Sequence, residues 1–189
     1  FDLPADFTGG FVTGATMSNF TCLGVARQWL GKKYGKDIAR EGVSGRLPVL
    51  TTTPHSSSLK SLSMLGMGSS NFITVKTMEG NREAMDMTDL EVKINELQGQ
   101  PFILISSAAT VNTADFDDCK TISKLKEKYD CWWHIDAAFG GFAALSKEHK
   151  HLLDGWAGAD SITVDSHKWL NVPYENAVFF VKEKHSHLQ

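Results

Sequence analysis

The amino-acid sequence predicts an α/β fold in which a doubly wound, mostly parallel sheet carries helices on both faces. Short apolar runs of strand length alternate with segments of helical periodicity at least five times along the chain. One run, residues 101–106, is continuously apolar, which is typical of a parallel strand buried on both faces. Several runs end in polar or small residues, as strands do where their carboxyl ends bind a ligand. We expect the 189 residues to form one domain over positions 1–189.

The elements are expected in a regular order. Strands are predicted over residues 11–13, 47–53, 72–76, 101–106, 131–136, 162–164 and 177–181. Apolar residues recur at helical spacing after residues 14, 54, 86 and 117, so a helix is expected at each place. Asp86 and the pair Asp117-Asp118 are suited to capping the last two helices. The Gly9-Gly10 pair is expected in a turn before the first strand.

Composition narrows the classes of function. The net charge of -3 and the sequence pI near 6.2 favour neither nucleic acid nor an anionic membrane as a partner. No apolar stretch has membrane-spanning length. Three separated cysteines without a paired motif argue against a disulfide framework and favour a reducing, cytoplasmic setting. His149 and His151 predict no metal site, because adjacent ligands on a helix point apart.

Lys168 is the residue that most needs a chemical explanation. It follows a predicted strand that ends at polar Asp165, so it lies at the carboxyl end of that strand. A solvent-exposed surface lysine is the simpler alternative, since lysine is seldom buried. The neighbouring Trp169, Leu170 and Pro173 predict partial desolvation, which favours a neutral amine able to form a Schiff base.

A second predicted strand also ends at a polar residue, Asp136. Small residues follow it, among them Ala138 and the pair Gly140-Gly141, and they would let a flat ring approach the backbone. A carboxylate in this position suits a group that keeps a pyridinium nitrogen protonated. We expect Asp136 and Lys168 to lie at the ends of nearby strands.

Two further segments lie between a strand and a helix. Ala15 and Thr16 open the first helix, where free backbone N–H groups and the helix dipole would favour a phosphate group. A simple N-cap by a Thr or Ser side chain is the alternative there. His55 opens the second helix, where it could cap or pack the chain rather than act on a ligand.

The segments His134-Ile-Asp-Ala-Ala138 and Asp165-Ser-His-Lys-Trp-Leu-Asn-Val-Pro-Tyr174 strongly resemble the pyridoxal-phosphate (PLP) dependent group II amino-acid decarboxylases. That family includes the aromatic-amino-acid, glutamate, histidine and diaminobutyrate decarboxylases. The resemblance covers nearly the whole chain. It implies the large domain of fold type I PLP enzymes, also described as the PLP-dependent transferase-like fold.

The resemblance also implies roles for individual residues. Lys168 would form the Schiff base with PLP, Asp136 would hold the pyridine nitrogen, and His55 would stack on the ring. The remaining cofactor-binding residues would be Ala15, Thr16, Thr110, Ala138 and His167, with the phosphate on Ala15, Thr16 and His167. Alanines 109 and 114 replace glycines of the family, and their methyl groups could narrow the pocket.

The activity implied is decarboxylation of an L-amino acid at its α-carbon. Another PLP reaction on the same fold, such as that of a carbon-carbon lyase or a transaminase, is an alternative. A non-catalytic relative acting as a binding subunit is a second one. The resemblance implies a homodimer with active sites at the subunit interface. The chain begins at Phe1 rather than Met, and we expect it to be a piece of a longer protein.

Overall fold

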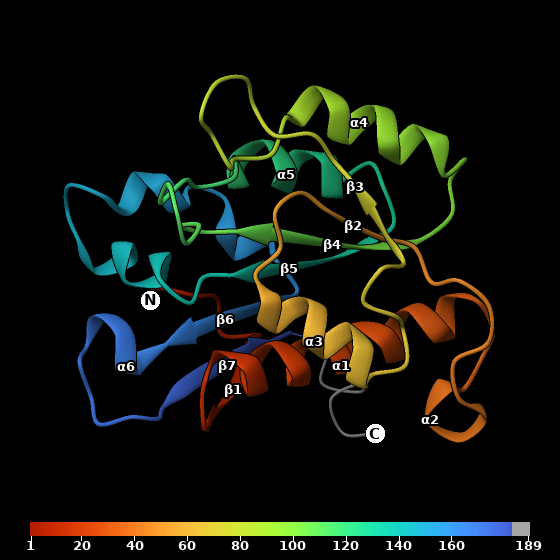
Figure 1. Cartoon of the computed structure of the whole chain (residues 1–189), viewed down its shortest axis with the longest axis horizontal. Coiled ribbons are helices and arrows are strands. Elements are labelled where there is room, and N and C mark those ends of the chain that lie inside the picture. Colours follow the sequence, from red (N-terminus) through yellow and green to blue (C-terminus); the bar gives the residue numbers. More distant parts are fainter. Residues whose placement is uncertain (183–189) are drawn as a thin grey trace.

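The computed structural model describes residues 1–182, which form a seven-stranded mixed sheet covered by helices on both faces (Figure 1). The strands are β1 (Thr8–Val12), β2 (Val49–Thr51), β3 (Phe72–Thr74), β4 (Phe102–Ser107), β5 (Cys131–Asp136), β6 (Ser161–Asp165) and β7 (Ala177–Val181). Their order across the sheet is β1-β7-β6-β5-β4-β2-β3. Strands β2 to β6 are parallel, whereas β7 runs antiparallel to both of its neighbours. The predicted α/β class and mostly parallel sheet are confirmed.

The helices follow the predicted alternation. They are α1 (Ala15–Lys33), α2 (Ile38–Glu41), α3 (Ser56–Met64), α4 (Met87–Glu96), α5 (Cys119–Lys126) and α6 (Ser166–Trp169), with 3-10 helices at Gly140–Leu145, Lys150–Leu153 and Trp156–Gly158. Asp86 caps α4 by accepting from the N–H of Thr88, as predicted. Only one of the two aspartates expected before α5 caps it. Asp118 accepts from Thr121 N–H, whereas Asp117 turns inward.

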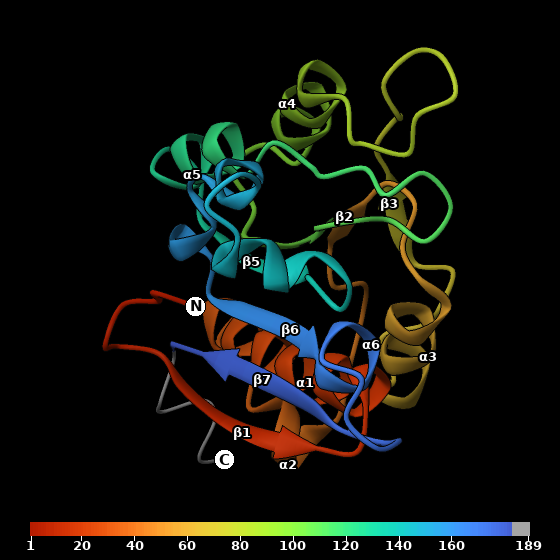
Figure 2. The ribbon, with the colours of Figure 1, turned by 90° about the vertical axis from the view of Figure 1, so that its left-hand side faces the viewer.

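The two N-terminal glycines belong to a strand rather than to the turn that we expected. A β-carbon on Gly9 would lie 2.5 Å from the carbonyl oxygen of Phe179, and one on Gly10 would lie 3.0 Å from the Phe179 ring. β1 therefore packs too closely against β7 for larger side chains there. Figure 2 shows β1, β7 and β6 side by side, with α1 behind them.

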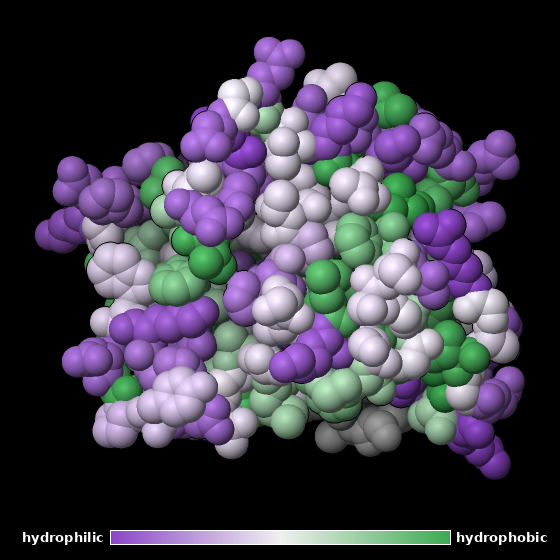
Figure 3. Space-filling model, viewed as in Figure 1, coloured by the Kyte–Doolittle hydropathy of each residue, from purple (hydrophilic) through white to green (hydrophobic). Residues whose placement is uncertain are grey.

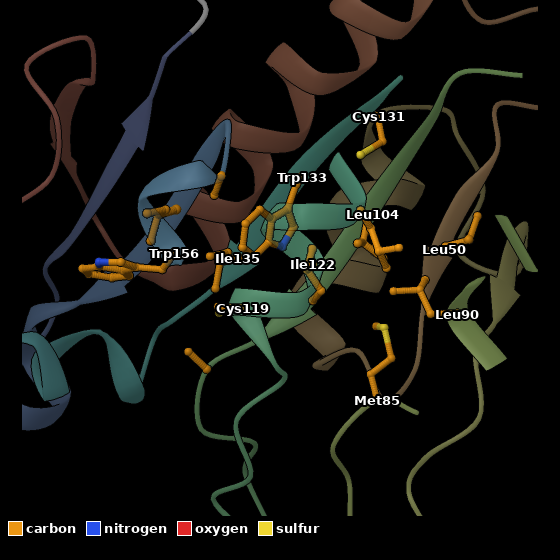
Figure 4. Close-up of a cluster of buried hydrophobic side chains, with 14 of the residues drawn as sticks. Leu50, Met85, Leu90, Leu104, Cys119, Ile122, Cys131, Trp133, Ile135 and Trp156 are labelled. Atoms are coloured by element: carbon orange, nitrogen blue, oxygen red, sulfur yellow. The ribbon is translucent and has the colours of Figure 1, made fainter. Parts of the chain in front are cut away.

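Two hydrophobic cores lie on opposite faces of the sheet. Successive side chains of a strand point to opposite faces, so Trp132 joins the core beneath α1 and α3 while Trp133 joins the core beneath α4 and α5. Figure 4 shows the second of these cores, in which Trp133 and Leu104 of the sheet meet Ile122 of α5. The sheet is thus buried on both sides, which explains its continuous apolar strands.

The central parallel strands end in polar residues along one edge of the sheet. Ser107 at the end of β4 pairs in register with Asp136 at the end of β5, and Asp165 ends β6. α6 follows β6 directly, at the same edge (Figure 2). Among the described residues, none of the helices combines the length and the apolar character that crossing a bilayer requires.

Candidate active site

Two hollows lie at the carboxyl edge of the parallel strands. The larger, about 340 Å³, is lined among others by Thr110, Asp136 and Ala138. The smaller, about 230 Å³, is lined among others by the first turn of α1. His55 and Lys168 line both hollows, so the two adjoin. All eight site residues predicted from the sequence line one or both: Ala15, Thr16, His55, Thr110, Asp136, Ala138, His167 and Lys168.

Lys168 lies on the helical turn α6 and extends into both hollows. Its Nζ is 4.0 Å from the centre of the Phe139 ring and 3.8 Å from Asp165 Oδ2, and its side chain is 23% exposed. The prediction that Trp169, Leu170 and Pro173 enclose it is wrong, because Trp169 and Leu170 are 70% and 54% exposed and Pro173 is exposed as well. Its apolar neighbour instead comes from the loop after β5.

Asp136 ends β5 and is almost completely buried. Its Oδ1 accepts a hydrogen bond from the Ala138 N–H at 3.2 Å. Its Oδ2 accepts from Asn19 Nδ2 at 2.9 Å and from Ser58 Oγ at 3.4 Å. These three donors fix the plane of the carboxylate at the wall of the larger hollow.

Asn19 and Ser58 were not predicted as site residues. Asn19 lies four residues after Ala15, so the two share one face of α1, and that spacing was the only signal available in the sequence. Ser58 belongs to α3, which packs on α1, and it precedes Asp136 by 78 residues in the chain. Their contacts with Asp136 therefore depend on how two helices dock on the sheet.

The first turn of α1 opens onto the smaller hollow. The N-cap residue is Gly14, and no side chain caps the helix, so the alternative of a Thr or Ser N-cap is wrong. The unpaired N–H groups of a helix N-terminus attract anions. The carboxylate of Glu175 also lines this hollow and opposes an anion there.

His167 lines the smaller hollow. Its Nδ1 accepts a hydrogen bond from the Asn176 N–H at 3.0 Å, which leaves Nε2 as the donor of a neutral ring. Asp165 Oδ1 lies 2.9 Å from the same nitrogen and accepts the backbone N–H of His167 at 3.3 Å. The ring also packs against Tyr174, with ring centres 4.5 Å apart.

His55 combines two of the arrangements considered from the sequence. It caps α3, because its Nδ1 accepts from the Ser57 N–H at 3.2 Å, and it lies 2.7 Å from Ser57 Oγ. It also lines both hollows. The cap holds the imidazole at the mouth of the site.

The loop after β4 covers the larger hollow. Thr110 is buried, and its hydroxyl lies 3.0 Å from that of Thr113 and accepts from the Asp115 N–H at 3.1 Å. Ala109 and Ala114 adopt φ of +67° and +54°, a region that favours glycine. These are the positions where the resemblance implied glycine. The positive φ of both alanines strains the backbone of this loop, whereas a narrowing of the pocket stays a prediction.

Gly140 and Gly141 do not serve the role expected of them. A β-carbon on Gly140 would lie 2.6 Å from the carbonyl oxygen of Ala108, and one on Gly141 would lie 2.8 Å from Val164. The glycines therefore let the segment after β5 pack against the β4 loop and β6. Ala138, two residues earlier, is the small residue that lines the larger hollow.

Within residues 1–182, no three His, Cys, Asp or Glu side chains gather as a metal site would require. His149 lies 3.0 Å from Ser146 Oγ, and His151 lies 2.9 Å from the Glu148 carbonyl oxygen. Cys22, Cys119 and Cys131 are buried thiols, and burial raises the pKa of each to about 12. The site is therefore built from an amine, a carboxylate, two imidazoles and a helix N-terminus.

A parallel sheet with a lysine and an aspartate at adjacent strand ends, beside an uncapped helix N-terminus, defines the class of PLP-binding α/β enzymes. The chain matches the family model described as the pyridoxal-dependent decarboxylase conserved domain over residues 2–189. The chain belongs to this family, and its cofactor is pyridoxal phosphate.

Two curated relatives and one solved structure illustrate the family. The chain is 34% identical over 189 residues to the aspartate 1-decarboxylase of Aliivibrio fischeri, covering 93% of this chain and 34% of that protein. It is 31% identical over 191 residues to the L-2,4-diaminobutyrate decarboxylase of Acinetobacter baumannii, covering 93% and 37%. The glutamate decarboxylase domain of a Vibrio parahaemolyticus diaminobutyrate-pyruvate transaminase and L-2,4-diaminobutyrate decarboxylase superposes with a TM-score of 0.88 at 31% identity, covering 98% of this chain and 41% of that one. The chain thus spans about a third of the length of these curated relatives.

Proposed function

We propose that the protein containing this chain is a PLP-dependent carboxy-lyase that decarboxylates an L-amino acid. The observation that carries the proposal is the placement of Lys168 and Asp136 after the adjacent parallel strands β6 and β5, on the wall of one hollow. Decarboxylase relatives that align over 93% of the chain support the reaction type. The alternatives, a carbon-carbon lyase or a transaminase of the same fold, would also use Lys168 and Asp136.

The residues present fit the cofactor group by group. Lys168 supplies an amine for the aldehyde carbon, and the buried Asp136 supplies a carboxylate for the ring nitrogen. The first turn of α1 at Ala15 and Thr16, together with His167, supplies hydrogen-bond donors for the phosphate. His55 would cover one face of the ring, and Thr110 and Ala138 line the same hollow.

PLP supplies an electron-accepting ring that stabilises the electron pair left when carbon dioxide departs. Asp136 would hold a proton at the ring nitrogen, because a fixed carboxylate favours the protonated form. Lys168 or His55 would return a proton to the substrate carbon, since both line the larger hollow. The surrounding loops would orient the substrate so that the bond to its carboxylate stands across the ring plane.

We propose in addition that the protein acts as a homodimer with its site at the subunit interface. None of the residues lining the two hollows is an arginine, and Lys168 is their one lysine, so a cation for the substrate carboxylate must come from elsewhere. Val111, Trp169 and Tyr174 are exposed apolar side chains beside the site, as an interface would require. The three buried thiols fit a cytoplasmic setting.

The test is covalent labelling followed by product analysis. Wild-type protein loaded with PLP is reduced with borohydride and digested, and the pyridoxyl label is expected on Lys168. The Lys168→Ala variant should lose the label, whereas Lys147→Ala, which changes an exposed lysine outside both hollows, should keep it. Carbon dioxide release from a panel of L-amino acids then separates decarboxylation from lyase or transaminase chemistry. A label on Lys147, or a keto acid as the main product, would contradict the proposal.

A further inference from the structure

A continuous chain of buried side chains joins the core beneath α1 to Asp136. Trp132 Nε1 donates to Ser161 Oγ at 2.9 Å, and Ser161 Oγ lies 2.9 Å from His134 Nδ1. His134 Nε2 lies 2.9 Å from Asn19 Oδ1, and the amide nitrogen of Asn19 reaches Asp136 at 2.9 Å. The first four residues are at most 1% exposed, so water does not complete any of these bonds.

The directions of the hydrogen bonds in this chain follow from the carboxylate at its Asp136 end. An indole N–H can only donate, and a carboxylate can only accept. Asn19 Nδ2 faces the Asp136 carboxylate, so Asn19 Oδ1 faces His134 Nε2, and that nitrogen must carry the proton. His134 Nδ1 is then an acceptor, and Ser161 Oγ can donate to it while accepting from Trp132. Burial lowers the pKa of His134, which keeps the ring neutral at pH 7. His134 Nε2–H therefore donates to Asn19 Oδ1, and the Asn19 N–H faces Asp136.

The opposite arrangement is excluded by the charge of Asp136. If His134 carried its proton on Nδ1, the Asn19 amide would turn over to donate to Nε2. The Asn19 oxygen would then lie 2.9 Å from the Asp136 carboxylate, where two acceptors repel each other. The Asp136 carboxylate therefore sets the orientation of the Asn19 amide.

The same amide also reaches the other side of the site. The second hydrogen of Asn19 Nδ2 is donated to Ser57 Oγ at 3.0 Å. Ser57 Oγ, 2.7 Å from His55 Nδ1, is then free to donate its own hydrogen to that nitrogen. One amide therefore links Asp136 at the floor of the larger hollow to His55 at its mouth.

We infer that Asn19, His134 and Ser161 are positioning residues for Asp136, and that their chain of buried hydrogen bonds holds the Asp136 carboxylate in the orientation that a cofactor nitrogen requires. The inference rests on the proposed function, because it assigns Asp136 to that nitrogen. The three residues line neither hollow, and they act on the cofactor site only through Asp136.

The fold supplies a matched control for this chain. Trp133, the next residue of β5, donates its indole N–H to Ser106 Oγ at 2.8 Å on the opposite face of the sheet. Ser106 is as buried as Ser161, and its hydroxyl bonds to Trp133 instead of to a residue of the site. Ser106→Ala and Ser161→Ala therefore remove equivalent tryptophan–serine bonds, of which only the second belongs to the chain that ends on Asp136.

The first measurement uses the cofactor-free protein. Side-chain ¹⁵N NMR of histidine-labelled protein at pH 7, with His134 assigned by comparison with His134→Gln, should show a neutral ring protonated at Nε2. A ring protonated at Nδ1, or at both nitrogens, would overturn the inference whatever the protein binds.

The second measurement is the affinity for PLP, with the pH titration of the visible absorption of the bound cofactor. Asn19→Leu should weaken PLP binding about 10- to 100-fold, the loss expected for one hydrogen bond to a charged group. Ser161→Ala should weaken it about 3- to 10-fold, as the loss of a neutral hydrogen bond does, and should shift the titration. Ser106→Ala should lower the unfolding midpoint as much as Ser161→Ala and leave both cofactor readouts unchanged.

If wild-type protein binds PLP and Ser161→Ala and Ser106→Ala change its PLP affinity equally, the positioning role is overturned while the proposed function stands. Wild-type protein that binds no PLP would overturn the proposed function first, and the positioning role with it. The two failures are therefore distinguishable.

Discussion

Ala109 and Ala114 lie at the two ends of one loop over the larger hollow, and both adopt positive φ, at +67° and +54°. A β-carbon makes this region unfavourable, so each alanine strains the loop at a place where glycine would be relaxed. Thr110 and Thr113 lie between them and are joined by their hydroxyl groups at 3.0 Å. The hydrogen bonds of the loop hold a backbone conformation that its own sequence disfavours.

Ala109→Gly and Ala114→Gly should each stabilise the protein by about 0.5–1 kcal/mol, because relief of strain exceeds the added flexibility of the unfolded chain. Urea unfolding monitored by tryptophan fluorescence measures the change. Ala108→Gly is the control, since Ala108 is buried and does not have positive φ. A destabilisation by all three glycines would show that the loop is not strained.

Asp117 should make the protein less stable as the pH rises from about 4 to about 6. Burial raises the pKa of this carboxyl to about 6, despite hydrogen bonds from the Met85 and Ser107 N–H groups. In that window the folded state keeps a proton that the unfolded chain releases, so stability is lost with rising pH, up to about 3 kcal/mol. The Asp117→Asn variant cannot titrate there and should lack this part of the pH dependence.

Asp118→Asn is the matched control for that measurement. Asp118 is an exposed helix cap, and its hydrogen bonds with Thr121 outweigh partial burial and lower its pKa. The contribution of Asp118 to folding stability therefore has the opposite pH dependence. It is present above the pKa of the unfolded chain and is lost as the pH falls. Urea midpoints at several pH values for the two variants should diverge in opposite directions from wild type. Parallel curves would contradict the assigned protonation of Asp117.

Asp136→Asn should retain the fold and the label on Lys168 while losing turnover by about 100-fold or more, as the loss of a fixed charge at a reacting group does. A neutral amide does not stabilise a protonated ring nitrogen as a carboxylate does. Asp130→Asn, which changes an exposed carboxylate paired with Lys33, should leave turnover unchanged. Rates are measured as carbon dioxide release. Near-normal turnover of Asp136→Asn would show that this carboxylate is only structural.

Glu175→Gln should strengthen PLP binding about threefold at low salt, since it removes a negative charge near the anion-binding turn of α1. The gain should shrink at high salt because exposed charges are screened. Glu148→Gln removes an exposed carboxylate that lines neither hollow and serves as the control. Weaker binding by Glu175→Gln would indicate that Glu175 supports the cofactor site instead.

The periodicity of the sequence determined the fold class and the strand ends that carry Asp136 and Lys168. Such features are local: a strand's apolar run, the polar residue that ends it and the helix that follows are all neighbours in the chain. Because parallel strands bring their carboxyl ends to one edge, local signals were also enough to gather the predicted residues. The eight predicted residues accordingly line the two hollows.

Contacts between elements were decided only by the tertiary structure. The neighbour of Lys168 is Phe139 rather than Trp169, because the turn α6 directs the amine toward the loop after β5 and the indole into solvent. Asn19 reaches Asp136 only because α1 packs across β5 and β6. The residues around a polar side chain in a helix do not indicate which strand it will contact. The docking of helices on a sheet depends on apolar surfaces spread over the whole chain.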